Sequence, residues 1–61
     1  MAIEKVSIKN IRREEDDKTY FVKVEYETTS VYGHGNTIKN AMEDASDILS
    51  SSYKRKIKVV Y

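Results

Sequence analysis

The architecture of this chain follows from one segment, Thr19-Tyr20-Phe21-Val22-Lys23-Val24-Glu25-Tyr26-Glu27-Thr28. Aromatic and β-branched residues occupy every second position, and charged residues occupy most of the positions between them. This alternation predicts a strand whose buried face carries Tyr20, Val22, Val24 and Tyr26. We expect the strand to continue through Val31 and Tyr32 and to end at Gly33-His34-Gly35.

A partner strand is predicted upstream, over residues 3–12, because apolar residues and lysines alternate there. The polar run between the two strands has the length of a hairpin loop, so the strands should pair antiparallel. The register that keeps the apolar face continuous pairs Ile8 with Val24 and Ile11 with Phe21. A register shifted by two residues preserves the same faces and stays open as an alternative.

An amphipathic helix is predicted after the glycines. Asn36 or Thr37 is a suitable N-cap. Apolar residues then recur at spacings of three and four, which indicates a helix of about four turns with one apolar side. These residues are Ile38, Ala41, Met42, Ala45, Ile48 and Leu49. We expect Ser50-Ser51-Ser52 to end the helix.

The last strand is predicted over residues 56–61, where Ile57, Val59 and Tyr61 should point inward. A strand–helix–strand connection is right-handed and should bring this strand parallel to the second one. The sequence therefore predicts an α+β fold of the β-β-α-β type in a single domain, residues 1–61. Its three-stranded sheet should have the order 2-1-3, with one helix packed on one face.

Composition narrows the class of protein. The chain has 61 residues, no Cys, one His and a formal net charge of +1. Because disulfides are excluded and metal ligands are scarce, so small a core must be stabilised by packing or by self-association. No apolar run has the length of a membrane span. We therefore expect a soluble, cytoplasmic protein without a cofactor.

Catalytic chemistry finds little support in the residues. His34 is the only imidazole, and one helix on one sheet offers little concavity in which a catalytic group loses its water. The acidic run Glu14-Glu15-Asp16-Asp17 lacks the alternating ligands and the glycine of a calcium loop. Gly33-His34-Gly35-Asn36-Thr37 lacks the lysine of a phosphate-binding loop. We expect neither an enzyme nor a metal site.

The sheet face away from the helix is the first candidate for function, because no second helix exists to cover it. It should combine apolar residues with mixed charges, which is the composition of a protein-binding surface. An ordinary solvated sheet face explains the same pattern equally well. Strand addition at a sheet edge, by a partner or by a second copy, is a further route. The residues predicted to bind a protein partner are Phe21, Lys23, Glu25, Val60, Arg12, Lys56 and Lys58.

The basic segment after the helix provides the alternative. Tyr53, Lys54, Arg55 and Lys56 combine a ring with three cations, a pattern that favours phosphate contacts and stacking on a base. The helix carries several acidic residues, so the charge is divided between faces, and nucleic-acid binding stands second.

The residues from Val6 to Leu49 resemble the small antitoxin domains of the HicB type. The resemblance consists of an antiparallel hairpin, a turn similar to Gly33-His34-Gly35-Asn36-Thr37, and a helix with alanines at Ala41 and Ala45. The chain is also similar to small β-β-α-β phage proteins, such as the RNA polymerase inhibitors of T7-like phages, in which a threonine-capped helix leads into a basic last strand. These resemblances imply a protein that binds and blocks a protein partner, either as an antitoxin or as an inhibitor from a phage or mobile element.

Overall fold

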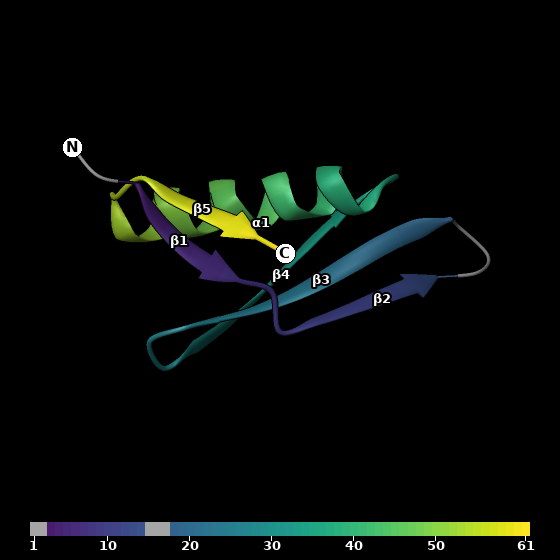
Figure 1. Ribbon diagram of the computed structural model, residues 1–61, viewed down its shortest axis with the longest axis horizontal. Coiled ribbons are helices and arrows are strands. Elements are labelled where there is room, and N and C mark those ends of the chain that lie inside the picture. The colour runs from purple at the N-terminus through teal and green to yellow at the C-terminus, as the bar shows by residue number, and fades with distance from the viewer. Residues whose placement is uncertain (1–2, 15–17) are drawn as a thin grey trace.

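The computed structural model describes residues 3–14 and 18–61 and has an α+β fold (Figure 1). Its described elements are, in order, β1 (Glu4–Ser7), β2 (Asn10–Glu14), β3 (Thr19–Tyr26), β4 (Thr29–Gly35), α1 (Ile38–Tyr53) and β5 (Ile57–Val60). β1 and β5 form a parallel pair, while β2, β3 and β4 form an antiparallel sheet in that order. The predicted fold class and helix are confirmed, and the predicted arrangement of strands is wrong.

The predicted second strand is two strands joined by a tight turn. β3 ends at Tyr26 and β4 begins at Thr29, and these two residues are paired across the turn. Glu27 has a φ of 56°, a left-handed conformation that Gly or Asn adopts more readily. Because Glu27-Thr28 contains neither of these residues, the run of strand-forming residues conceals the reversal of the chain.

The predicted first strand is also divided, at Lys9 and Asn10. The Lys9 N–H donates to the Lys23 carbonyl at 2.7 Å, while Asn10 is the residue paired with Lys23 in the ladder. Two residues of one strand therefore oppose one residue of the other, which is the arrangement of a β-bulge and bends the strand. The extra residue shifts the register by one, so Ile11 pairs with Val22 and not with its predicted partner.

The reversal between β3 and β4 also changes the direction of the last strand. The chain enters α1 from β4, which runs opposite to β3, and the helix returns it to the start of β5. β5 therefore runs parallel to β1, with Lys5 opposite Lys58 and Val6 opposite Val59. The predicted order 2-1-3, which made the first and last strands antiparallel, is wrong for this reason.

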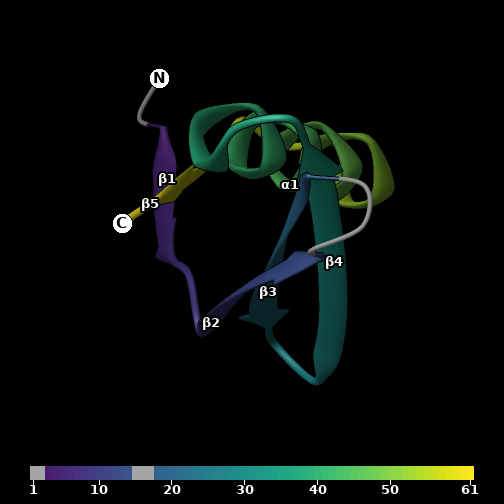
Figure 2. The ribbon, with the colours of Figure 1, turned by 90° about the vertical axis from the view of Figure 1, so that its right-hand side faces the viewer.

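The core lies between α1 and the two sheets (Figure 2). The alternation and the helical spacing predicted every fully buried apolar residue on the correct side of its element. Two inward predictions are wrong. Tyr61 is 81% exposed, because it lies beyond the paired part of β5, and Ile48 is an exposed residue of α1. The buried core residues are Val22, Val24, Tyr26, Ala41, Ala45, Leu49, Ile57 and Val59.

Two glycines allow α1 to pack directly on β4. A Cβ atom on Gly33 would lie 2.3 Å from the Ala41 carbonyl oxygen and 2.6 Å from the Ala45 nitrogen. Neither Gly33 nor Gly35 has a positive φ. These glycines therefore permit a close approach of backbones. β4 ends at Gly35, within the segment predicted to end the strand.

The start of α1 is the predicted one, and its end is not. The Thr37 hydroxyl accepts a hydrogen bond from the Asn40 N–H at 3.0 Å, so Thr37 is the N-cap, as one of the two predictions has it. The helix continues through the three serines to Tyr53. It ends at Lys54, whose φ of 54° is left-handed. The predicted end at Ser50-Ser51-Ser52 is wrong.

Candidate functional site

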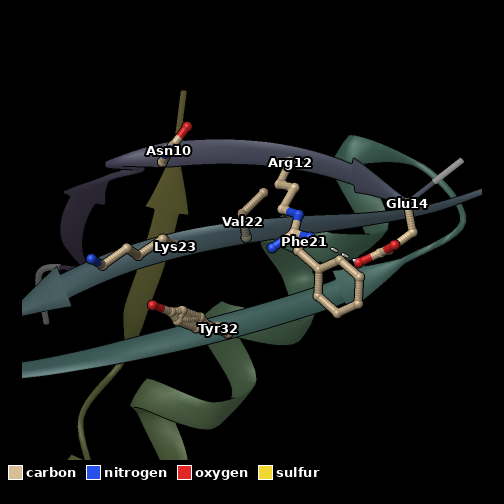
Figure 3. A pocket seen from close by; sticks show the side chains of 7 residues that line it. All are labelled: Asn10, Arg12, Glu14, Phe21, Val22, Lys23 and Tyr32. Atoms are coloured by element: carbon tan, nitrogen blue, oxygen red, sulfur yellow. Dashed lines mark ion pairs between the residues drawn. The ribbon is translucent and has the colours of Figure 1, made fainter.

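A pocket of about 360 Å³ opens on the side of the β2–β3–β4 sheet that faces away from α1 (Figure 3). Arg12 pairs with Phe21, and Lys23 pairs with Tyr32, so side chains from all three strands meet on this side of the sheet. Among the residues that the structure describes, no strand or helix covers it. The lining residues are Asn10, Arg12, Glu14, Phe21, Val22, Lys23 and Tyr32. We call the outward side of this sheet, including Glu25 and His34, the pocket face.

Charges on the pocket face are partly paired. Arg12 lies 3.4 Å from Glu14, and Lys9 lies 3.9 Å from Glu25. Lys23 has no ion-pair partner among the described residues. Such exposed pairs contribute little to stability, because water and salt screen them. Their side chains are therefore available to a partner at small cost.

Three rings lie on the pocket face. The ring centroids of Phe21 and His34 are 6.0 Å apart, with 33° between the ring planes. Tyr32 is 53% exposed. The rings can contact an apolar or aromatic side chain of a partner. The cations and carboxylates around the rings can form hydrogen bonds with polar groups next to that side chain.

The residues predicted to bind a protein partner are divided between the two sheets. Arg12, Phe21 and Lys23 line the pocket together, and Glu25 lies on the same face. The others lie in β5 or just before it, and β5 belongs to the separate β1–β5 pair. Figure 2 shows β5 and β4 on opposite sides of the molecule. These separated residues are Lys56, Lys58 and Val60.

Sequence reasoning missed four residues of the pocket: Asn10, Glu14, Tyr32 and Val22, the last of which was predicted only as a core residue. Tyr32 was missed because the hairpin turn was not predicted. A signal was present in the two glycines, since glycines at alternate positions mark the side of a strand that another backbone approaches. Gly33 pairs with the buried Val22, so Tyr32 must point to the opposite side of the sheet.

Two residues of the segment predicted as a nucleic-acid site, Tyr53 and Arg55, contact Tyr26 of this protein. The Tyr53 ring packs edge-on against Tyr26, with centroids 4.6 Å apart. Arg55 donates a hydrogen bond to the Tyr26 hydroxyl at 2.7 Å. Lys54 forms the left-handed cap of α1. Lys56 is exposed and has no ion-pair partner among the described residues.

The Tyr26 hydroxyl joins β1, β3 and the end of α1. It donates to Glu4 Oε1 at 2.8 Å and accepts from Arg55, which also lies 3.9 Å from Glu4 and 3.8 Å from Glu27. Burial raises the pKa of Tyr26, the hydrogen bond to Glu4 raises it further, and Arg55 opposes both effects. The hydrogen bond with Tyr26 raises the pKa of Arg55. The arrangement is that of a structural link between the two sheets.

Catalysis and metal binding have little geometric basis in the described residues. His34 Nδ1 lies 3.4 Å from Asp44 Oδ2, and both side chains are open to water. Over residues 3–14 and 18–61, no three metal-ligating side chains gather at one place. The predicted acidic run falls partly outside the described residues, because residues 15–17 are not among them. No helix in the described part of the chain is long and apolar enough to cross a membrane.

The outer edge of β5 is closed by two helix serines. The Ser46 hydroxyl accepts a hydrogen bond from the Val59 N–H at 2.8 Å. The Ser50 hydroxyl accepts from the Ile57 N–H at 3.1 Å and donates to the Ile57 carbonyl at 3.0 Å. These are backbone groups with which an added strand would pair.

The edges of the other sheet are closed in part by similar contacts. At β4, the His34 N–H donates to Asp44 Oδ2 at 3.0 Å. At β2, the Ile11 N–H donates to Asn10 Oδ1 at 2.8 Å. Side chains of this protein therefore occupy backbone donors at three of the four outer strands, β2, β4 and β5.

No protein-family model, curated protein or solved structure matches this chain. The function is therefore inferred from the geometry of the pocket face.

Proposed function

We propose that this chain is a small, non-enzymatic protein-binding module that receives a side chain of its partner in the pocket of the β2–β3–β4 sheet. The observation that carries the proposal is an aromatic pocket on a sheet face that no described element covers. A partner that fills it would remove Phe21 and Tyr32 from water.

The composition of the pocket supports a protein partner. Tyr and Arg are enriched at the residues that contribute most to protein–protein affinity, and a polar rim is typical around them. Arg12 and Tyr32 provide these two residue types, and Asn10, Glu14 and Lys23 provide the polar groups. A volume of about 360 Å³ lies at the small end of the range of ligand pockets, which favours one bulky side chain.

The sheet edges give less support to binding by strand addition. An added strand must pair with free backbone groups, and Ser46, Ser50, Asp44 and Asn10 already occupy several of them. The pocket face is therefore preferred over the edges as the partner surface, including for a second copy of the chain.

The consequence of binding that we propose is inhibition of the partner. The HicB-type antitoxins and the phage inhibitors of RNA polymerase, which the sequence pattern resembles, both block a protein. Nucleic-acid binding through the segment from Tyr53 to Lys56 has weaker support, because Tyr53 and Arg55 are engaged with Tyr26.

Affinity capture with matched variants tests the proposal. Wild type, Phe21→Asp and Tyr32→Asp are immobilised and exposed to lysate of the organism that encodes the chain. Ile48→Asp is the control, since Ile48 is an exposed apolar residue on α1, on the opposite side of the sheet. Circular dichroism verifies that each variant folds.

We expect a captured protein that both pocket variants lose and that Ile48→Asp retains. If every captured protein binds the folded pocket variants as well as it binds wild type, the pocket is not the binding site. Light scattering of the pure protein distinguishes a second copy from an outside partner.

A further inference from the structure

The outward side of the β1–β5 pair carries three lysines, which we call the lysine face. Lys5 and Lys58 are opposite one another in the parallel register, and Lys56 lies two residues before Lys58 and shares its side of the strand. All three are exposed. Within the described residues, none of them forms an ion pair. The lysine face is thus a patch of exposed lysines without ion-pair partners among the described residues.

The pairing of Lys5 with Lys58 opposes the stability of the sheet. Like charges directly opposite one another on neighbouring strands repel, whereas a lysine opposite a carboxylate is favourable. The one glutamate of β1, Glu4, lies on the other side of the strand from Lys5 and accepts a hydrogen bond from Tyr26. Natural proteins break such local rules mainly at functional sites. The lysine face is therefore a candidate for binding.

The surroundings of the lysine face favour a short acidic segment over a nucleic acid. A groove of about 260 Å³ between α1 and β5 brings Glu43 and Asp47 beside Lys58. These carboxylates would repel a continuous chain of phosphates, whereas discrete acidic side chains can avoid them. The ring nearest in sequence, Tyr53, packs against Tyr26 and offers no stacking surface.

We propose that the lysine face binds an acidic segment of the protein partner, with Asp or Glu at alternating positions. In an extended strand, side chains two residues apart are about 6.6 Å apart on one side, which matches Lys56 and Lys58. This inference rests on the proposed protein-binding function and adds the charge of the partner. An extended peptide of twelve residues reaches about 40 Å. The longest dimension of the described chain is 39 Å, so a peptide of this length can extend across the whole protein.

Selection from random twelve-residue peptides displayed on phage tests the proposal. The bait is wild type, the double variant Lys5→Gln/Lys58→Gln or the control Arg13→Gln/Lys18→Gln, which removes the same charge from exposed positions outside both the lysine face and the pocket. Affinities of selected peptides, and of a single-stranded oligonucleotide of twenty nucleotides, are then measured by fluorescence anisotropy at low and high salt.

We expect wild type and the control to select peptides rich in Asp and Glu, and the double variant to bind them about fivefold to tenfold more weakly. Selection without acidic bias, equal binding by the double variant, or tighter binding of the oligonucleotide would overturn the inference. The two proposals fail separately. Selected peptides that are not acidic but are lost by Phe21→Asp overturn the lysine face and support the pocket. Acidic peptides that are lost by the double variant and retained by Phe21→Asp support the lysine face, and the pocket is then judged by the capture experiment alone.

Discussion

Ser46 on α1 accepts a hydrogen bond from the backbone N–H of Val59 on β5, at 2.8 Å, and its hydroxyl donates to the Met42 carbonyl at 2.9 Å. The Ser46 hydroxyl thereby accepts the hydrogen bond that, in a wider sheet, the backbone of a neighbouring strand would accept from β5. Ser50 repeats the contact one turn later, at Ile57. The helix consequently both covers the core and closes one edge of the fold.

Replacing Ser46 by Ala removes this contact. Val59 is buried, so its N–H would lose its partner, at a cost of about 1–3 kcal/mol. The higher helix propensity of Ala returns about 0.5 kcal/mol. We expect Ser46→Ala to lower the free energy of unfolding by about 1–2 kcal/mol in urea titrations. Ser51→Ala, at an exposed helix position, should be neutral or stabilising, and equal losses in the two variants would contradict this role of Ser46.

Replacing Gly33 by Ala tests the close packing of α1 on β4. The added Cβ would meet backbone atoms of Ala41 and Ala45 that no side-chain rotation can move away. We expect a loss of about 3 kcal/mol or more, measured by thermal unfolding, because overpacking displaces the helix. Ser30→Ala, on the outward side of the same strand, is the control. A Gly33→Ala protein as stable as wild type would show that the helix lies farther from the sheet.

The Tyr26 hydroxyl should make the stability depend on alkaline pH. Its pKa in the folded protein is above the unfolded value of about 10, because burial and Glu4 disfavour the phenolate. The stabilisation is therefore complete below pH 10 and is lost as the pH rises through the folded pKa. We expect the free energy of unfolding to fall more steeply between pH 9 and 11 in wild type than in Tyr26→Phe. Parallel pH profiles for the two proteins would contradict the effect.

Periodicity in the sequence predicts most of the fold. Alternation identifies the inward residues of β3 and β5, and the spacing of apolar residues identifies the buried side of α1. It misses the hairpin, because Glu27 adopts a left-handed conformation without being Gly or Asn. It also misses the bulge at Lys9, although the sequence carries a signal: Lys9 and Asn10 are consecutive polar residues, and the apolar alternation resumes out of phase at Ile11.

The candidate site was predictable in part for the same reasons. Phe21 and Lys23 follow from the alternation in β3, and Arg12 follows from its neighbour strand. Tyr32 depends on the hairpin, so it could not be placed. The separation of Lys58 from the pocket depends on the parallel pairing of β5 with β1, which no local pattern encodes.

Replacing Lys5 by Glu should stabilise the protein and impair binding. The new carboxylate would face Lys58 and replace a repulsion by an attraction, a gain of about 0.2–1 kcal/mol that salt weakens. We expect a higher melting temperature at low salt together with weaker binding of acidic peptides. Lys18→Glu, at an exposed position outside the lysine face, should leave peptide binding unchanged. If Lys5→Glu binds acidic peptides as tightly as wild type, the lysine face has no role in recognition.

The pocket face as the partner surface is tested most directly by a nuclear magnetic resonance titration of the ¹⁵N-labelled protein with its captured partner. The account predicts that the largest amide shifts cluster at Arg12, Phe21, Lys23 and Tyr32, with the outer side of α1 unchanged. Shifts that concentrate on α1, and leave the amides of these four residues unperturbed, would contradict it.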